Sequence, residues 1–405
     1  MKIKRCRNCN RRNLTKVFSL GKISYTGKFP KKDKKIKKAP LSIVMCKDCG
    51  LVQLENKFNL KYLYGPDYGY RSGINESMVN HLKNVVKKLK KKVKLKKNQL
   101  VLDIASNDAT LLKFYPKNII TFGIDPLVKK YIKSYKSINF KVSNFFSKSL
   151  IRKKTKKKFK IITALSVFYD LEKPNKFLKE VQNILHEDGI FVLEFADLDS
   201  ILKNRMFDTI CHEHLEYYST RVLVDMCKNN KLKVIDIIEN EINGASKQFY
   251  ISHENSNFKI NKNQVQKVLK REKKNKINSK ITLIKFFSTI NKIKKKLLKK
   301  LDIIKKQDKI IHGYGASTKG NVLLQYFGID KKYIDYIAER NENKFDLYTP
   351  GTNIKIISEN ESRNKKPDYY LVLPWHFKNQ ILKRESMMRK KGVKFIFPLP
   401  NIKVN

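Results

Sequence analysis

Four of the six cysteines stand in two pairs with the same spacing, Cys6 with Cys9 and Cys46 with Cys49. Two residues between cysteines let one tight turn present both thiolates to one ion, and two such turns complete a tetrahedral zinc site. Disulfides are the weaker interpretation in a reducing compartment, and neither pair has a thioredoxin-like context. Four protein ligands leave no open position on the metal, so we expect this zinc to be structural.

Two of the seven histidines lie close together in the segment His212-Glu213-His214. Histidine is the side chain whose ordinary pKa best suits proton removal near neutral pH. Ordinary polar contacts from one side of an extended segment would equally explain this spacing. A metal site made of Cys211, His212 and His214 is disfavoured, because adjacent residues of a strand point to opposite faces.

A cofactor site is predicted where an apolar strand beginning at Gln99 runs into a turn of small residues. Residues 101–109 fit the loop that wraps the methionine part of S-adenosylmethionine in methyltransferases. Asp125 ends the next strand about 22 residues after Asp103, the usual distance for an acidic residue that accepts the ribose hydroxyls. A dehydrogenase would need G-x-G-x-x-G at this turn, which has no glycine; a sheet without a ligand is the alternative. The expected cofactor contacts are Asp103, Ala105, Ser106, Asn107 and Asp125.

Ala105 and Ala109 stand where such loops usually carry glycine, because the backbone must approach the ligand closely. Alanine adds only a methyl group and is tolerated where φ is negative. The fit of these methyl groups beside a cofactor therefore depends on φ at both positions.

Alternating strands and helices must position these residues. After a helix at 74–97, the apolar strands at 99–104, 119–124, 160–165 and 190–195 are separated by helical patterns that start near 109 and cover 128–135 and 175–185. Continuous apolar strands between amphipathic helices predict a parallel sheet covered on both faces. The fold class is therefore α/β, with an N-terminal zinc module and a central Rossmann-like domain.

A second α/β unit follows one or two long connecting helices predicted at 261–309. It begins with a strand and the turn Gly313-x-Gly315, and continues with strands at 333–338, 368–373 and 394–397 and a helix at 377–388. Two such glycines are weak evidence for phosphate binding, and the tight turn alone is the alternative explanation. Lys319 follows the turn, where it could meet a diphosphate.

The length of 405 residues predicts two or three domains, and we place them at 1–60, 61–260 and 261–405. The net charge of +53 raises the question of nucleic-acid binding, but lysines are spread along the whole chain and no recognisable nucleic-acid module accompanies them. We expect no nucleic-acid partner and no membrane span, and a soluble, cytoplasmic protein. The oligomeric state is left open, and a monomer is compatible with the sequence.

Several motifs in order along the chain resemble the sugar C-methyltransferases, which use S-adenosylmethionine to methylate a carbon next to the ketone of nucleotide-linked 4-keto deoxysugars. Besides the four cysteines, the resemblance rests on these motifs: Asp67-Tyr-Gly-Tyr-Arg-Ser72, Leu102-Asp-Ile-Ala-Ser-Asn-Asp108, Phe207-Asp-Thr-Ile-Cys-His-Glu-His-Leu-Glu-Tyr-Tyr-Ser219, Asn243-Gly-Ala-Ser246, Gly313-Tyr-Gly-Ala-Ser-Thr-Lys-Gly-Asn321, Glu339-Arg-Asn341, Tyr348-Thr-Pro-Gly-Thr352 and Tyr370-Leu-Val-Leu-Pro-Trp375. It implies a class I methyltransferase domain in the centre and a C-terminal Rossmann-like domain that closes on a nucleotide sugar.

The resemblance also implies roles for single residues. His214 is the expected base that removes the proton next to the ketone, with Glu213 orienting it or holding the sugar. Tyr68 and Tyr70 are expected in the substrate pocket, and Lys319 is expected on the nucleotide sugar.

Three positions depart from the family pattern and put the identity of the sugar in doubt. Cys211 stands where many relatives have tyrosine, Asp170 where many have histidine and Ser166 where many have asparagine. We expect Asp170, Cys211 and Ser166 to contact the substrate. Methyl transfer to oxygen or nitrogen of a related sugar, and RNA binding by a zinc knuckle with a degenerate cofactor loop, are the alternatives.

Overall fold

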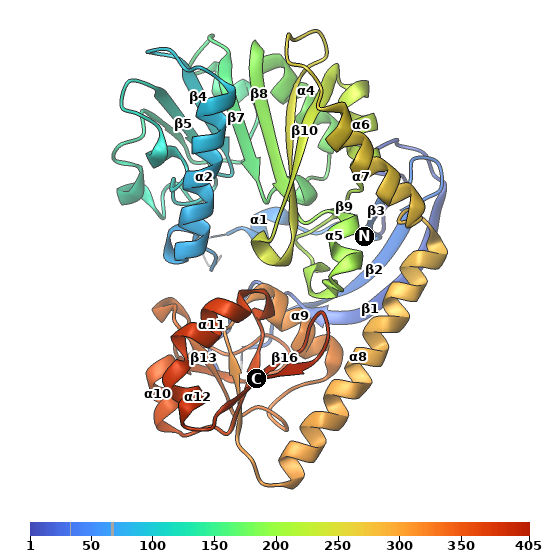
Figure 1. Cartoon of the computed structure of the whole chain (residues 1–405), viewed down its shortest axis with the longest axis vertical. Coiled ribbons are helices and arrows are strands. Elements are labelled where there is room, and N and C mark those ends of the chain that lie inside the picture. Colours follow the sequence, from blue (N-terminus) through green and yellow to red (C-terminus); the bar gives the residue numbers. More distant parts are fainter. Residues whose placement is uncertain (33, 66–68) are drawn as a thin grey trace.

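The computed structural model describes residues 1–32, 34–65 and 69–405, so Tyr68 lies outside the described residues. Two α/β bodies, upper and lower in Figure 1, are joined along one side by the long helix α8 (Lys280–Lys306). A small antiparallel sheet lies on the same side of the molecule as α8, between the two bodies. Among the described helices, none combines the length and apolar character needed to cross a bilayer.

The small sheet has the strand order β1-β2-β3-β9. Its first three strands come from the N-terminus and its fourth from the histidine segment: β1 (Leu14–Ser24), β2 (Lys38–Cys46), β3 (Val52–Leu54) and β9 (Glu216–Tyr217). The short helix α1 (Leu60–Leu63) follows β3. The N-terminal sheet is therefore completed by a segment that lies far outside residues 1–60.

The upper body is built on a seven-stranded sheet with the order β10-β11-β8-β7-β4-β5-β6. Its strands are β4 (Leu100–Ile104), β5 (Ile120–Ile124), β6 (Phe140–Val142), β7 (Phe159–Leu165), β8 (Leu185–Phe195), β10 (Leu232–Asn240) and β11 (Ser246–His253). Strands β4 to β8 are parallel, which confirms the prediction for the strands at 99–104, 119–124, 160–165 and 190–195. Strand β11, which was not predicted, runs antiparallel between β8 and β10. From β4 the chain winds first towards β6 and then, through β7, towards β8, which opens a crevice at the carboxyl ends of β4 and β7.

The upper helices are α2 (Glu76–Lys92), α3 (Lys148–Arg152), α4 (Pro174–Ile184), α5 (Leu198–Lys203) and α6 (Thr220–Asn229). The predicted helices after β4 and at 128–135 were wrong: these stretches contain only the 3₁₀ turns Leu112–Phe114 and Ile132–Tyr135. Pro116 stops the first, because the residue before a proline is disfavoured in the helical conformation. In the second, the hydroxyl of Tyr135 donates to the carbonyl oxygen of Asn107 (2.9 Å), which holds the turn against the end of β4.

The lower body contains a six-stranded sheet with the order β14-β13-β12-β15-β16-β17. Its strands are β12 (Ile311–Tyr314), β13 (Tyr336–Glu339), β14 (Lys355–Ser358), β15 (Tyr369–Val372), β16 (Lys394–Phe397) and the antiparallel edge strand β17 (Lys403–Val404). The helices are α9 (Thr318–Phe327), α10 (Glu359–Asn364), α11 (Lys378–Arg384) and α12 (Ser386–Lys390). The helix predicted at 377–388 is thus two helices that separate at Glu385, whose side chain is drawn into ion pairs with Arg363 and Arg384.

The two predicted connecting helices are α7 (Lys262–Lys274) and α8. In α8 the buried residues Leu283, Phe286, Ile290, Ile293 and Leu297 recur every three or four positions, as expected of a helix with one apolar face. This face packs against the N-terminal sheet and the lower body, which share one hydrophobic core. The small sheet therefore packs against α8 and the lower body and shares their hydrophobic core.

A buried ionic cluster fastens α7 to the upper sheet. The ammonium of Lys247 in β11 is fully buried and lies 2.7 Å from the carboxylate of Asp197, 3.3 Å from that of Asp199 and 2.8 Å from that of Glu272. Arg271 pairs with Asp199 at 2.7 Å. Three carboxylates that lie close enough to share one metal ion are here paired with two protein cations, Lys247 and Arg271.

Candidate active site

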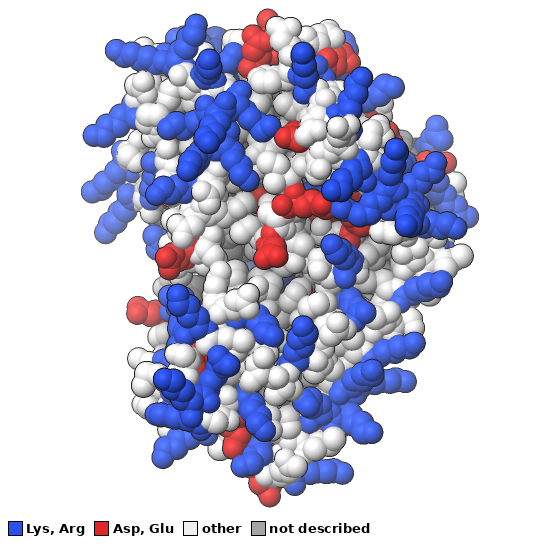
Figure 2. All heavy atoms as spheres, in the orientation of Figure 1, with Lys and Arg blue, Asp and Glu red and all other residues white. Residues whose placement is uncertain are grey.

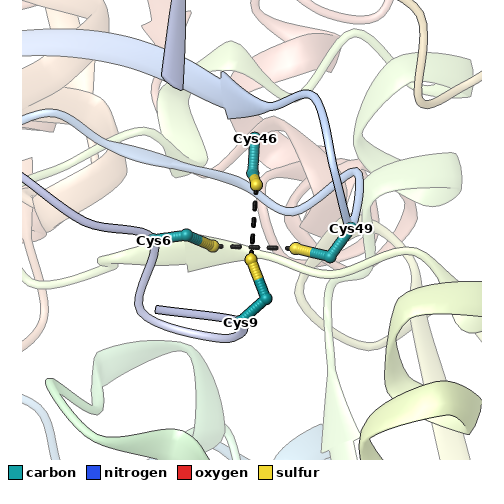
Figure 3. Close-up of side chains that lie close together, drawn as sticks. All are labelled: Cys6, Cys9, Cys46 and Cys49. Carbon is teal, nitrogen blue, oxygen red and sulfur yellow. Dashed lines mark hydrogen bonds between the residues drawn. The ribbon is translucent and has the colours of Figure 1, made fainter. Parts of the chain in front are cut away.

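The two cysteine pairs meet at the base of the N-terminal sheet (Figure 3). The sulfur atoms of Cys6 and Cys49 lie 3.6 Å apart and those of Cys9 and Cys46 3.5 Å apart, and all four lie within 4.8 Å of one another. A disulfide would need about 2.05 Å, whereas zinc–sulfur bonds of about 2.3 Å in a tetrahedron place the sulfurs about 3.8 Å apart. The cluster therefore fits a zinc ion and does not fit a pair of disulfides.

The surroundings of the cysteine cluster shift the pKa values of its thiols in different directions. The hydrogen bond with Cys49 lowers the pKa of Cys6 to about 5, and the side-chain amide of Gln53 donates to the Cys6 sulfur at 3.2 Å. The same contact with Cys6 raises the pKa of Cys49, and burial raises that of Cys46 to about 11. A bound zinc ion would supply the positive charge that deprotonates the remaining thiols.

A cleft of about 1140 Å³ separates the upper and lower bodies. Its walls come from the β4 loop and β5 end of the upper body, from Gly27 of the N-terminal module, from the histidine segment, and from the β12–α9 turn of the lower body. Of the expected site residues, the cleft is lined by Tyr70, Asp103, Ala105, Ser106, Asn107, Asp125, Asp170, Glu213, His214 and Lys319.

The cofactor loop adopts the conformation of a glycine loop although it contains no glycine. Ala105 has φ +59°, Ala109 φ +60° and Asn107 φ +50°, so neither alanine has the negative φ at which its methyl group is easily tolerated. L-residues pay about 1–2 kcal/mol for the left-handed region, and here the turn imposes it because the backbone amide of Ala105 donates to the carbonyl oxygen of Ile124 at 2.9 Å. The loop keeps its tight path along the crevice despite the two methyl groups.

Two buried carboxylates flank this loop. Burial raises the pKa of Asp103 to about 7, while the hydroxyl of Thr163 donates to it at 2.6 Å. Burial also raises the pKa of Asp125 to about 6, opposed by the backbone amides of Leu127 and Asn107 that donate to it. Asp125 thus stands at the end of β5 beside the loop, where it can face a ribose.

The segment that carries Tyr70 is fastened over the cofactor loop. The side-chain amide of Asn107 donates to the carbonyl oxygen of Tyr70 (3.2 Å) and accepts from the backbone amide of Ser72 (3.0 Å). Arg71 donates to Asp108 at 3.0 Å. The ring of Tyr70 is 44% exposed in the cleft wall, where it could meet a ligand.

His214 is held by the backbone on both sides. Its neighbour Leu215 donates to the carbonyl oxygen of Tyr169 in the upper body (2.6 Å) and accepts from the amide of Leu54 at the end of β3 (2.9 Å). The ring donates through Nδ1 to the carbonyl oxygen of Thr209 at 2.7 Å and packs on the Tyr169 ring with centroids 4.2 Å apart. Because a carbonyl oxygen can only accept, Nδ1 carries the hydrogen and Nε2 presents a lone pair.

The two histidines of the segment have different surroundings. Burial lowers the pKa of His214 to about 3, helped by the positive charge of Lys319, so the ring is neutral at ordinary pH. His212 is fully buried, packs against Tyr25 and Phe58, and donates to the carbonyl oxygen of Ala39. His214 therefore faces the cleft, whereas His212 belongs to the core of the N-terminal module.

Glu213, Cys211 and Asp170 lie deeper than His214. Glu213 does not orient the His214 ring, whose Nδ1 is bonded to Thr209; its carboxylate instead faces Gly27, where a Cβ would lie 2.7 Å from Oε1. Cys211 is fully buried and is absent from the cleft lining among the described residues. Burial raises the pKa of Asp170, which does line the cleft.

Lys319 reaches the cleft from the first turn of α9. Its ammonium donates to the carbonyl oxygen of Asn243 at 2.8 Å. Gly315 in the preceding turn has φ +83°, and a Cβ there would lie 2.7 Å from Pro374, so this turn requires glycine.

His376 lines the same cleft and was missed by the sequence analysis. Burial lowers its pKa, and no described residue offers a hydrogen bond to its Nδ1. Its position directly after the motif that ends at Trp375 was the only signal available. Thr209 and Asn243 were also missed, because they act through backbone carbonyls that no side-chain pattern reveals.

Comparison with known families gives three consecutive matches. Residues 6–64 match the family described as "Putative zinc binding domain", residues 75–237 a methyltransferase domain, and residues 241–400 the C-methyltransferase C-terminal domain. The C-methyltransferase NovU of Streptomyces niveus is 24% identical over 371 residues, which cover 90% of this chain and 87% of that protein.

Two solved structures each resemble the chain over less than half of its length. A S-adenosylmethionine-dependent methyltransferase from Clostridium acetobutylicum is 13% identical and covers 43% of this chain and 92% of its own, with a TM-score of 0.36. Magnesium protoporphyrin IX methyltransferase from Synechocystis, solved with bound SAH, is 12% identical and covers 48% and 92%, with a TM-score of 0.34.

Proposed function

We propose, from the premise that this chain belongs to the C-methyltransferases that join these three domains, that it methylates a carbon next to the ketone of a nucleotide-linked sugar. The observation that carries the proposal is a neutral imidazole, His214, whose lone pair is presented at the cleft that also holds the cofactor loop. Polysaccharide or glycoside biosynthesis is the process in which such a sugar would be used.

S-adenosylmethionine, when bound, supplies an electrophilic methyl group. The residues present fit it: the left-handed turn at Ala105 and Asn107 leaves room along the crevice, and Asp125 stands where a ribose needs an acceptor. The chain's own contribution is to hold the turn at Ala105 and Asn107 and the carboxylate of Asp125 in place before the substrate binds.

Carbon methylation needs a base, because a carbon next to a ketone becomes a nucleophile only after losing a proton. The lone pair on Nε2 of His214 can take that proton, and the Thr209 carbonyl can stabilise the imidazolium that results by accepting from Nδ1. Tyr70, Asp170 and Glu213 line the same cleft and are proposed to hold the sugar. The bound sugar would lie between the histidine segment and the lower body.

The test is to incubate the protein with thymidine-diphosphate 4-keto-6-deoxyglucose in deuterated water without S-adenosylmethionine. Exchange of a proton next to the ketone is expected with the wild type and is expected to be lost in His214→Ala, with binding of S-adenosylhomocysteine retained. Methyl transfer that leaves every such proton in place would instead indicate transfer to oxygen or nitrogen.

The distribution of charge on the face drawn in Figure 2 gives no support to the RNA-binding alternative. Lysine and arginine side chains are spread over the upper and lower parts of the face in Figure 2 and do not gather in one patch. A nucleic-acid site would concentrate them along one groove. Tight RNA binding that weakens steeply with salt, without affinity for S-adenosylhomocysteine, would reverse this conclusion.

A further inference from the structure

We propose that Lys319 stabilises the enolate oxygen that forms when His214 removes the proton next to the ketone. The inference rests on the proposed function and assigns Lys319 to the reacting centre, away from the diphosphate that the sequence suggested. It concerns the proton-transfer step only.

The position of Lys319 is fixed by tight backbone packing. A Cβ on Gly320, the next residue, would lie 2.7 Å from the Cβ of Leu373, so the first turn of α9 presses on the end of β15. The ammonium crosses from the lower body to the carbonyl oxygen of Asn243 in the upper body. Lys319 therefore begins on a tightly packed helical turn of the lower body, and its side chain crosses the cleft to the upper body.

The charges around Lys319 point to the reacting centre. The carboxylate of Asp208, which accepts a hydrogen bond from the indole of Trp375 at 2.9 Å, is its strongest electrostatic partner. Burial lowers the pKa of His214 and of His376, and the positive charge of Lys319 lowers both further. Lys319, His214 and His376 also line the same cleft, so the ammonium, the proposed base and a second neutral imidazole share one site.

Proton removal next to a ketone requires stabilisation of the oxygen that becomes negative, and an ammonium group can supply it. The C–H bond next to the ketone breaks, its electron pair forms the carbon–carbon double bond of the enolate, the carbonyl π pair moves to oxygen, and the proton goes to Nε2 of His214. A weakly basic imidazole cannot hold that proton unless the negative charge on oxygen is stabilised at the same time. One of the three ammonium hydrogens is used by the Asn243 carbonyl, and the others can reach an oxygen in the cleft.

The experiment measures hydrogen–deuterium exchange of thymidine-diphosphate 4-keto-6-deoxyglucose in deuterated water, without S-adenosylmethionine, at saturating sugar. Lys319→Met is expected to slow exchange by about 10²–10³-fold, the usual effect of losing one oxyanion donor, with the affinity for thymidine diphosphate changed less than about threefold. Lys319→Arg should recover part of the rate, since it keeps the charge.

Lys294→Met provides a matched control. The ammonium of Lys294 also donates to a carbonyl oxygen, that of Tyr326, at 2.7 Å, but it lies on α8 and is not among the described residues that line the cleft. This variant is expected to exchange at the wild-type rate. The exchange rate of Lys294→Met shows whether losing any half-buried lysine slows exchange, or only losing Lys319.

Two results would overturn the proposal. Wild-type exchange in Lys319→Met would remove the lysine from proton transfer, and weakened thymidine-diphosphate binding with a normal saturated rate would return it to the diphosphate. Absence of exchange in the wild type itself would overturn the proposed function together with this inference, so the two failures can be told apart.

Discussion

The rate at which His214 removes the sugar proton should stay constant on acidification over a range in which an ordinary histidine base would fail. An imidazole with the ordinary pKa of about 6.5 is only about 3% neutral at pH 5, which would slow proton removal about 30-fold relative to pH 8. Burial, aided by Lys319, lowers the pKa of His214 to about 3, so about 99% of the rings remain neutral at pH 5. The direction follows because a lowered pKa favours the neutral, proton-accepting form.

The assay is deuterium exchange into the keto sugar between pH 8 and pH 5, without S-adenosylmethionine. Omitting the cofactor matters, because Asp103 and Asp125 have pKa values of about 7 and about 6 and would alter its binding over the same range. His214→Ala defines the background at each pH, and circular dichroism checks that the protein stays folded. A tenfold fall in rate per pH unit below about 6.5 would refute the claim that burial controls this histidine.

Three further properties follow from the contacts described, and a fourth from a glycine. The affinity for S-adenosylhomocysteine should fall as the pH drops through about 6, because protonation of Asp125 removes the charge that accepts the ribose hydroxyls; a flat calorimetric profile from pH 8 to pH 5 would contradict this. Cys46→Ser should release zinc and lower the melting temperature, since metal binding contributes folding free energy; metal analysis that still finds one zinc per chain would be inconsistent with the four-cysteine site. Lys247→Met should lower the free energy of unfolding by about 3–5 kcal/mol, because it leaves buried carboxylates uncompensated; a loss below about 1 kcal/mol in urea denaturation would show that the cluster contributes little. Gly27→Ala should reduce turnover roughly tenfold in a folded protein by displacing the Glu213 carboxylate, since positions near the chemistry tolerate little movement; unchanged turnover would mean that Glu213 is not needed where it lies.

Local spacing was enough to predict the zinc cluster and eight of the 17 strands among the described residues. The two-residue interval within each cysteine pair is itself a geometric constraint, and β16 was predicted at the residues where it occurs, because a short apolar run between polar residues leaves few alternatives. The strand reversal at β4 was likewise implied by the order of strands and connections.

Features that depend on distant partners could not be read from the sequence. The positive φ of Ala105 arises from a bond to Ile124 on the neighbouring strand, and propensity alone argues for the opposite sign. The separation of His212 from His214 results from a turn closed by the bond from the amide of His214 to the carbonyl oxygen of Cys211, which no periodicity announces. Cys211 was expected in the pocket because it stands where many relatives have tyrosine, yet it is fully buried and is not among the described residues that line the cleft.

The two-residue strand β9 has a consequence for protein engineering. Because Tyr217 pairs with Val52 and Glu216 with Gln53, the edge of the first sheet is supplied by the same stretch of chain that carries His214. Arg7 in the first cysteine turn lies 3.5 Å from the Glu216 carboxylate and so reaches this edge as well. A chimera with a foreign N-terminal module would also need the matching replacement of residues 207–219. Without it, β9 would lose its partner strand, and both the position of His214 and the zinc site would be disturbed.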